Sequence, residues 1–206
     1  SGNNITHCDH GIELDTSCSF NAIFENNIAD SNKNGINMAY SSSNNSIIEN
    51  NITSNSNFGI DLYECSNNTI SRNNIEANAY DGIIIQEHSN NNTVIGNSIT
   101  ANNYGGVYLL SSSNCVISGN NITNNNDYGV GLDSSSGNTV SGNNITNNGN
   151  EGVYLYGSSD NTIKGNSIAY SGDKGIRMYW SSNNNTISGN NITHCDHGIE
   201  LDTSCS

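Results

Sequence analysis

The chain repeats a pattern of about 23 residues along its whole length. Each unit carries an isoleucine near its start and a glycine six or seven positions later. The isoleucines are Ile5, Ile28, Ile52, Ile75, Ile99, Ile122, Ile145, Ile168 and Ile192, and the glycines are Gly11, Gly35, Gly59, Gly82, Gly106, Gly129, Gly152, Gly175 and Gly198. A period of this length is typical of stacked, solenoid-type folds. Eight complete units and a partial ninth predict one repeat domain over residues 1–206, with neither a linker nor a second domain.

Alternation within each unit predicts strands. The glycine is followed by segments such as GINM, GIDL, GVYL and GIEL, in which apolar residues recur with a period of two. We expect three short strands per unit, centred near Ile5, Ile12–Leu14 and Ile23, with turns rich in Asn, Ser, Gly and Asp between them. One unit cannot bury its own apolar face, whereas units stacked about 4.8 Å apart enclose a continuous interior. The predicted fold is therefore an all-β solenoid.

Strand parity predicts that one asparagine of every unit points inward. If Ile5 faces the interior, Asn3 does too, whereas Asn4 faces solvent. The equivalent inward positions form the column Asn3, Asn26, Asn50, Asn73, Asn97, Asn120, Asn143, Asn166 and Asn190. A second column runs through Asn21, Asn45, Asn68, Asn92, Cys115, Asn138, Asn161 and Asn185. Stacked amides can hydrogen-bond to one another, so we predict two internal asparagine ladders.

Composition makes such ladders necessary and excludes some functions. The chain has 44 Asn and 31 Ser but only three Phe and one Trp, so large apolar side chains cannot supply its core. Its formal net charge of −14 excludes the basic surface of a nucleic-acid-binding protein. No apolar run approaches the length of a membrane-spanning helix, and no basic-then-apolar leader opens the chain. We therefore expect no membrane-spanning segment and no targeting signal within these residues.

The repeat units resemble a known family. Units such as SGNNITNNNDYGVGLDSSSGNTV and SGNNITNNGNEGVYLYGSSDNTI are similar to the NosD or CASH-type repeats of right-handed parallel β-helices. The resemblance covers essentially the whole chain, and its matching positions are the inward residues of the scaffold. It implies a right-handed parallel β-helix in an extracellular protein of archaeal surface-layer or appendage type. Sugar binding or sugar processing is the family's other role, although no family catalytic motif falls on a position of this sequence.

A second, longer repeat is superimposed on the first. Residues 1–19, SGNNITHCDHGIELDTSCS, recur without a change at 188–206, eight coils further along the chain. Other coils resemble one another only loosely, so we interpret the chain as a window on an array with a 187-residue unit. An artificial duplication of one coil is the alternative. Open strand edges are templates for another chain, so we expect end-to-end self-assembly into a filament with an axial repeat of about 38 Å.

Glycosylation signals are frequent. The triplet Asn-x-Thr or Asn-x-Ser begins at Asn4, Asn44, Asn51, Asn67, Asn91, Asn121, Asn144, Asn184 and Asn191. Strand parity turns all nine outward, which favours some glycan decoration. An Asn-rich and Thr-rich repeat also produces such triplets by chance. Asn121 and Asn144 would lie only about 4.8 Å apart, which argues against full occupancy.

The sequence offers weak signals for metals. Six cysteines show no zinc-ribbon spacing, and we expect mostly unpaired, partly buried thiols. The HCDH tract at 7–10 and 194–197 contains ligand types suited to zinc or copper, but four consecutive turn residues rarely converge on one ion. We interpret the tract as solvated turn residues. Calcium on turn oxygens such as those of Asp127, Asp133 and Asp160 is an optional cofactor, and none is required.

Catalytic groups are not evident. Asp61 and Glu64 are the nearest approach to a carboxylate pair, and no basic residue stands at the matching positions of neighbouring coils, so surface charge is the favoured interpretation. The face that follows the glycines also carries aromatic residues. They are Tyr108, Tyr154, Tyr156, Tyr179 and Trp180, with Lys174 and Arg177 beside them. We favour lateral contacts or structural stacking for these rings over glycan binding.

These observations predict a structural, extracellular or cell-surface protein that forms a filament, sheath or surface layer by repetition. The expected partners are other copies of the chain and glycans, and no nucleic acid. A carbohydrate-binding adhesin is the second hypothesis. A polysaccharide lyase, hydrolase or epimerase is the third, because no catalytic constellation was found, and the chain is therefore predicted not to be an enzyme.

Overall fold

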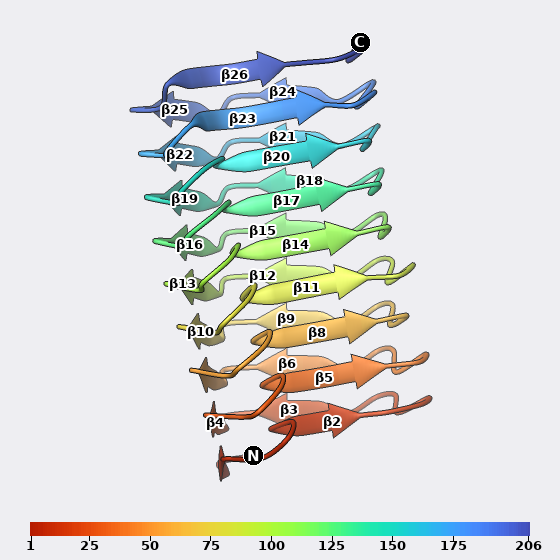
Figure 1. Ribbon diagram of the computed structural model, residues 1–206. Helices are drawn as coiled ribbons and strands as arrows, with labels where there is room; N and C mark the ends of the chain where they lie inside the picture. The colour runs from red at the N-terminus through yellow and green to blue at the C-terminus, as the bar shows by residue number, and fades with distance from the viewer.

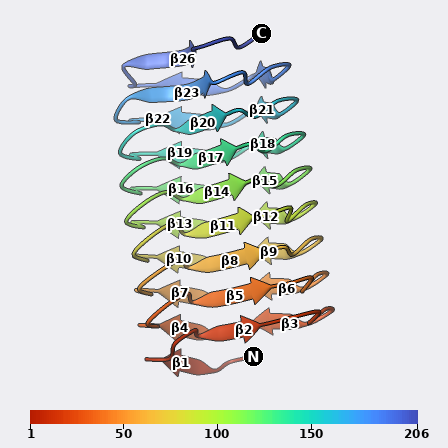
Figure 2. The same cartoon turned by 45° about the vertical axis from the view of Figure 1, so that its right-hand side comes forward.

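The computed structural model describes residues 1–206 as a stack of coils built from 26 strands and no helix (Figure 1). Each strand pairs in parallel with the equivalent strand of the next coil, so three long sheets run along the stack. Figure 2 shows the coils from a second side, with the two chain ends at opposite ends of the stack. The predicted all-β solenoid with three short strands per coil is confirmed. No helix is available that could span a membrane.

The three sheets take one strand from each coil. Sheet A consists of β1 (Asn4–Thr6), β4 (Asn27–Ala29), β7 (Asn51–Thr53), β10 (Asn74–Glu76), β13 (Ser98–Thr100), β16 (Asn121–Thr123), β19 (Asn144–Thr146), β22 (Ser167–Ala169) and β25 (Asn191–Thr193). Sheet B consists of β2 (Ile12–Leu14), β5 (Ile36–Ala39), β8 (Ile60–Tyr63), β11 (Ile83–Gln86), β14 (Val107–Leu110), β17 (Val130–Asp133), β20 (Val153–Tyr156), β23 (Lys174–Tyr179) and β26 (His197–Leu201). Sheet C consists of β3 (Ala22–Phe24), β6 (Ser46–Ile48), β9 (Thr69–Ser71), β12 (Thr93–Ile95), β15 (Val116–Ser118), β18 (Thr139–Ser141), β21 (Thr162–Lys164) and β24 (Thr186–Ser188).

The strand register places the same or a similar residue of each coil directly beside its equivalent in the next coil. Ile75 pairs with Ile52 on one side and with Ile99 on the other, and the equivalent positions of the other coils do the same. A single apolar cluster of 31 buried residues therefore runs through the interior of the stack. The repeated glycine has a packing role here, because a Cβ at Gly82 would lie 2.5 Å from Cγ2 of Ile99. This contact explains why glycine recurs with the same period as isoleucine.

The asparagine column that begins at Asn3 forms a hydrogen-bonded ladder between sheets C and A. In a typical step, the backbone N–H and Nδ2 of Asn97 both donate to Oδ1 of Asn120, at 2.9 and 3.0 Å. Nδ2 of Asn97 also donates to the carbonyl oxygen of Ile70. The members from Asn26 to Asn166 are buried, whereas the end members Asn3 and Asn190 are exposed and half-buried.

Two further polar columns lie at the corners on either side of sheet B, and neither was predicted. The first contains amides that repeat the same step, for example Nδ2 of Asn102 donating to Oδ1 of Asn125. Its buried members are Ser31, Asn55, Asn78, Asn102, Asn125, Asn148 and Ser171. The second is a serine column in which each hydroxyl oxygen accepts from the backbone N–H one coil earlier, as Ser135 does from Ser112. Its buried serines are Ser42, Ser89, Ser112, Ser135, Ser158 and Ser182.

The cysteines occupy positions in these columns. Cys65 stands in the serine column, and its backbone N–H donates to the hydroxyl of Ser89. Cys115 stands in an asparagine column, and its backbone N–H donates to Oδ1 of Asn138. Burial raises the pKa of both thiols to about 11, so they stay protonated at neutral pH. All six cysteines are unpaired, and these two serve as small replacements for Ser and Asn.

Replacing Asn97 by Ala tests the ladder. The change removes the acceptor of the backbone N–H of Asn73 and the donor to the carbonyl of Ile70, leaving buried polar groups without partners. We expect the free energy of unfolding to fall by about 3 kcal/mol or more. Chemical denaturation followed by circular dichroism measures this change. Asn103→Ala, which removes an exposed amide, is the matched control and should cost less than about 0.5 kcal/mol. Equal effects of the two changes would contradict a structural role for the ladder.

Candidate functional site

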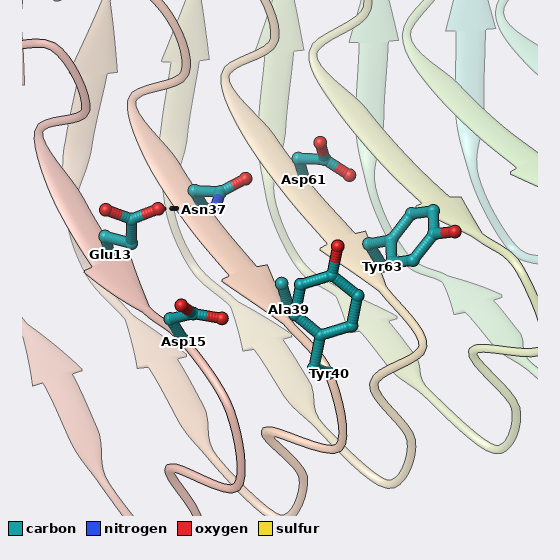
Figure 3. A pocket seen from close by; sticks show the side chains of 7 residues that line it. All are labelled: Glu13, Asp15, Asn37, Ala39, Tyr40, Asp61 and Tyr63. Atoms are coloured by element: carbon teal, nitrogen blue, oxygen red, sulfur yellow. Dashed lines mark hydrogen bonds between the residues drawn. The ribbon is translucent and has the colours of Figure 1, made fainter.

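A pocket of about 300 Å³ opens on the outer face of sheet B, across the first coils. Its lining residues are Glu13, Asp15, Asn37, Ala39, Tyr40, Asp61 and Tyr63. Figure 3 shows the carboxylates of Glu13 and Asp15 at one end of the pocket and Asp61 and Tyr63 at the other. The pocket thus combines three acidic side chains with two phenol rings.

The parallel register of sheet B places these side chains. Glu13 on β2, Asn37 on β5 and Asp61 on β8 are direct neighbours in the register, so their side chains form one row across the strands. Asn37 links the row, because its Nδ2 donates to Oε1 of Glu13 at 3.2 Å. Asp15 directly follows β2, at the rim of the pocket.

Asp61 is the chemically distinctive residue of this row. Its side chain is only 8% exposed, although its strand position points away from the core. Nε2 of Gln86 donates to it at 2.8 Å and Nδ2 of Asn34 at 3.2 Å. Burial raises the pKa of the carboxyl to about 6, against the opposing effect of the two amides. A carboxyl that titrates near neutrality can both donate and accept a proton under physiological conditions.

The interpretation of Asp61 and Glu64 as surface charge is wrong for Asp61. Strand parity predicted that its side chain points outward. In the structure, Asn34 from the coil before and Gln86 from the coil after cover this side chain, so it is buried. Glu64 is exposed and does not line the pocket. The carboxylates that share the pocket with Asp61 come instead from the first coil.

Two tyrosines form the apolar wall of the pocket. The rings of Tyr40 and Tyr63 meet edge to face, with centroids 5.5 Å apart. Tyr40 is 52% exposed, so a face of its ring remains available to a ligand. An open aromatic ring beside hydrogen-bonding groups can accommodate a ligand with both apolar and hydroxyl-bearing surfaces.

A second buried carboxyl lies further along the same face. The side chain of Tyr128 crosses the coil below it, where Gly105 leaves room, and its hydroxyl donates to Oδ1 of Asp81 at 2.7 Å. The backbone N–H of Gly105 donates to the same oxygen. Burial raises the pKa of Asp81 to about 6 and also raises the pKa of Tyr128. Sequence reasoning missed this pair, and its only signal was a glycine at 105 in a column of larger residues.

The predicted aromatic residues all lie on or beside the outer face of sheet B. The ring of Tyr154 lies over Gly131, edge to face with Tyr128 at 4.8 Å. The hydroxyl of Tyr108 donates to Asp133 at 3.1 Å. With the rings of the next coils these tyrosines form a continuous aromatic surface.

The C-terminal end of this surface is the most exposed. Tyr156 and Trp180 stack with centroids 5.9 Å apart, and Trp180 is 60% exposed. The guanidinium of Arg177 lies 4.5 Å from the ring centre of Tyr179. Arg177 also pairs with Glu151 and Glu200, each at 3.4 Å. The two cationic side chains on β23 are therefore held in ion pairs.

The candidate glycosylation sites lie outside the core. Asn51 is half-buried, and the other eight sequon asparagines are exposed. Neighbouring amides contact each other along sheet A, as when Nδ2 of Asn144 donates to Oδ1 of Asn121 at 2.7 Å. A glycan on one of these two residues would therefore displace the amide of the other.

The structure contains no group of three or more His, Cys, Asp or Glu side chains that could hold a metal ion. His7 in the HCDH tract is exposed, and the thiol of Cys8 beside it contacts the carbonyl of Thr6. Asp127 accepts a hydrogen bond from Asn150, and Asp133 accepts one from Tyr108. The HCDH tract and these aspartates therefore form no cluster of three such side chains.

Two family models match the chain. The model for a right handed beta helix region matches residues 82–206, and the model for the periplasmic copper-binding protein NosD matches residues 1–105. The chain belongs to the right-handed β-helix proteins and carries NosD-type repeats. The predicted resemblance and the right-handed coil are confirmed. A search of curated proteins found no match.

Several solved structures with a similar fold are described as epimerases or catalytic domains. The periplasmic alginate epimerase AlgG matches with a TM-score of 0.85 and 21% identity, over 91% of this chain and 49% of its own. The A-module of the mannuronan C-5 epimerase AlgE4 of Azotobacter vinelandii matches with a TM-score of 0.77 and 18% identity, over 90% and 57%. The Agl-KA catalytic domain matches with a TM-score of 0.77 and 15% identity, over 96% and 46%. The chain thus spans about half the length of these proteins, and the likeness establishes the fold.

The prediction that the chain is not an enzyme is contradicted by these comparisons. The neighbours in fold include epimerases and a catalytic domain. The prediction rested on the lack of a catalytic constellation, and it overlooked a carboxyl that becomes buried only when the coils stack.

The buried carboxyls predict an unusual pH dependence of stability. The pKa of Asp81 rises from 3.8 to about 6 on folding, so the folded state binds more protons between these values. The contribution of Asp81 is therefore present at low pH and is lost as the pH rises through about 6. This rise in the pKa of Asp81 corresponds to roughly 2 to 3 kcal/mol of stability. We expect Asp81→Asn to stabilise the protein relative to wild type above pH 6, and to lose this advantage near pH 4.

Denaturant unfolding at a series of pH values measures the difference between variant and wild type. Asp160→Asn is the matched control, because it makes the same substitution at an exposed site. A difference between Asp81→Asn and wild type that does not vary with pH would show that Asp81 is not held protonated in the fold.

Proposed function

We propose that the chain binds a polysaccharide on the outer face of sheet B and that Asp61 acts on the bound sugar as an acid–base group. The observation that carries the proposal is the pocket over β2, β5 and β8, in which a buried carboxyl with a pKa of about 6 faces a cavity lined by Tyr40 and Tyr63. A pKa near the operating pH is the property that proton transfer to or from a substrate requires.

The rest of the face supports the binding of an extended ligand. The aromatic surface through Tyr108, Tyr154, Tyr156, Tyr179 and Trp180 lies along the same side of the stack as the pocket. Exposed rings such as that of Trp180 offer flat apolar surfaces next to hydroxyl groups. The names of the neighbours also support this class, since two of them are an alginate epimerase and a mannuronan epimerase. NosD and AlgG are both described as periplasmic, and this similarity favours an exported protein.

Asp61→Asn tests this function. The amide keeps the shape of the carboxyl and an acceptor for one of its two amide donors, but it cannot transfer the proton, so turnover of polysaccharide should fall by about 100-fold or more while binding persists. Reducing-end release and product chromatography over a panel of polysaccharides measure turnover, and affinity electrophoresis measures binding.

Glu64→Gln is the control for this experiment, because Glu64 follows β8 directly but is exposed and outside the pocket. It should retain full turnover. Wild-type protein that neither binds nor alters any polysaccharide, or an Asp61→Asn variant with unchanged turnover, would refute the proposal.

A second function is favoured by the recurrence of residues 1–19 at 188–206. We propose that the chain belongs to a longer array of 187-residue units that forms an extracellular filament, sheath or surface layer. The recurring segment supports this, because β26 pairs with β23 in the same parallel manner as every earlier pair, so the stack continues without a break. Glycans on the exposed sequon asparagines are part of this proposal.

Electron microscopy of the assembled protein tests the array. Eight coils at the spacing of β-strands predict filaments with an axial repeat of about 38 Å. Particles that remain single and short at all concentrations would contradict assembly, and a repeat unrelated to eight coils would contradict the 187-residue unit.

A further inference from the structure

We infer that the pocket takes a neutral polysaccharide and hydrolyses its glycosidic bond with inversion at the anomeric carbon, with Asp61 as general acid and Glu13 as general base. This inference rests on the proposed function of the same site. The proposed substrate class, a neutral polysaccharide, differs from the alginate and mannuronan for which the epimerase neighbours are named.

The charges around the pocket exclude a polyuronate as the favoured ligand. Glu13, Asp15 and Asp61 line the pocket, and none of the five Lys and Arg side chains does. The cations on the same sheet, Lys174 and Arg177, lie on β23 and are already paired with acidic residues. A uronate carboxylate in the pocket would therefore meet like charges and no counter-charge, in a protein of net charge −14. A sugar that carries only hydroxyl groups meets no such repulsion.

The spacing of the strands that carry Glu13 and Asp61 suits an inverting arrangement with a water molecule between acid and base. Glu13 and Asp61 lie on β2 and β8, with β5 between them in the register. Two interstrand spacings separate their backbones by about 9 to 10 Å. Inverting glycosidases hold their carboxyl groups roughly 6.5 to 9.5 Å apart, whereas retaining enzymes need about 5 Å. The carboxylate of Glu13 already reaches the amide of Asn37 on the intervening strand, which brings it closer to Asp61 than the backbones are.

The surroundings of the two groups assign their roles. Asp61 is the buried member of the pair, and burial favours its protonated form over the opposing effect of the two amide donors, which suits the group that begins the reaction with a proton. Glu13 is the exposed member of the pair and faces the solvent that supplies the attacking water. Its contact with Nδ2 of Asn37 orients one oxygen and leaves the other available to accept a proton.

The reaction balances with water as the only co-reactant. Glu13 removes a proton from water, and the water oxygen forms a bond to the anomeric carbon from the face opposite the leaving group. The bond from the anomeric carbon to the glycosidic oxygen breaks, and Asp61 donates its proton to that oxygen. The products are a new reducing end of inverted configuration and a free hydroxyl group. Proton exchange with solvent then restores both carboxyls.

The test incubates the full chain with laminarin, xylan, mannan and dextran, and in parallel with alginate and pectate, each with and without calcium. Proton NMR during the first turnovers reads the anomeric configuration of the new reducing end. We expect hydrolysis of at least one neutral polysaccharide, an inverted first product and no change in either polyuronate. Asp61→Asn and Glu13→Gln should each lower the rate about 100-fold or more, and Glu64→Gln should leave it unchanged. Circular dichroism melting verifies that each variant is folded.

The other outcomes separate this inference from the proposed function. Asp61-dependent turnover of alginate or pectate would overturn the neutral substrate while the proposed function stands. A product of retained configuration, or a fully active Glu13→Gln variant, would overturn the two-carboxylate mechanism. Binding of a neutral polysaccharide without hydrolysis would overturn the reaction but preserve the binding face. The absence of both binding and turnover for all six polysaccharides would overturn the proposed function itself.

Discussion

The buried polar columns are the interaction on which this structure depends. Each coil contains few apolar side chains, and its corners must turn backbone polar groups toward the interior. The side-chain amide of Asn97 satisfies such groups in three ways. Its Oδ1 accepts from the backbone N–H of Asn73, and its Nδ2 donates to Oδ1 of Asn120 and to the carbonyl oxygen of Ile70. Such a network is stable only when every member finds its partner, which favours the same residue type at equivalent positions of successive coils. The sequence repeat is the direct result.

This arrangement separates the scaffold from the surface. Inward positions repeat because each must match the coils above and below, whereas the outward positions of sheet B differ from coil to coil. Asp61, Tyr108 and Arg177 stand at the same place in their respective coils and have different contacts. A site can therefore be assembled from neighbouring coils without any change in the core. The pocket and the aromatic surface are two examples on one sheet.

Sequence periodicity predicted the strands, the isoleucine columns and the position of the Asn3 column, because each follows from local alternation. It missed the column through Asn102 and the serine column, because these residues lie in corners where alternation no longer indicates direction. It also misjudged Asp61, whose burial comes from Asn34 and Gln86 in other coils. Periodicity could not predict the hydrogen bond from Tyr128 to Asp81, because the two residues are two coils apart in the sequence and meet only where Gly105 leaves room between them.

The parallel register has a consequence for how such a face can evolve. Because every coil joins its neighbours through the same columns, a whole coil can be gained or lost between β8 and β20 with the seams on both sides intact. The distance from the acidic pocket to the exposed tryptophan would then change in steps of one strand spacing, about 4.8 Å. That increment approximates the length of one sugar ring. The number of coils between the two sites would therefore set the number of sugar residues that a bound chain needs to span them.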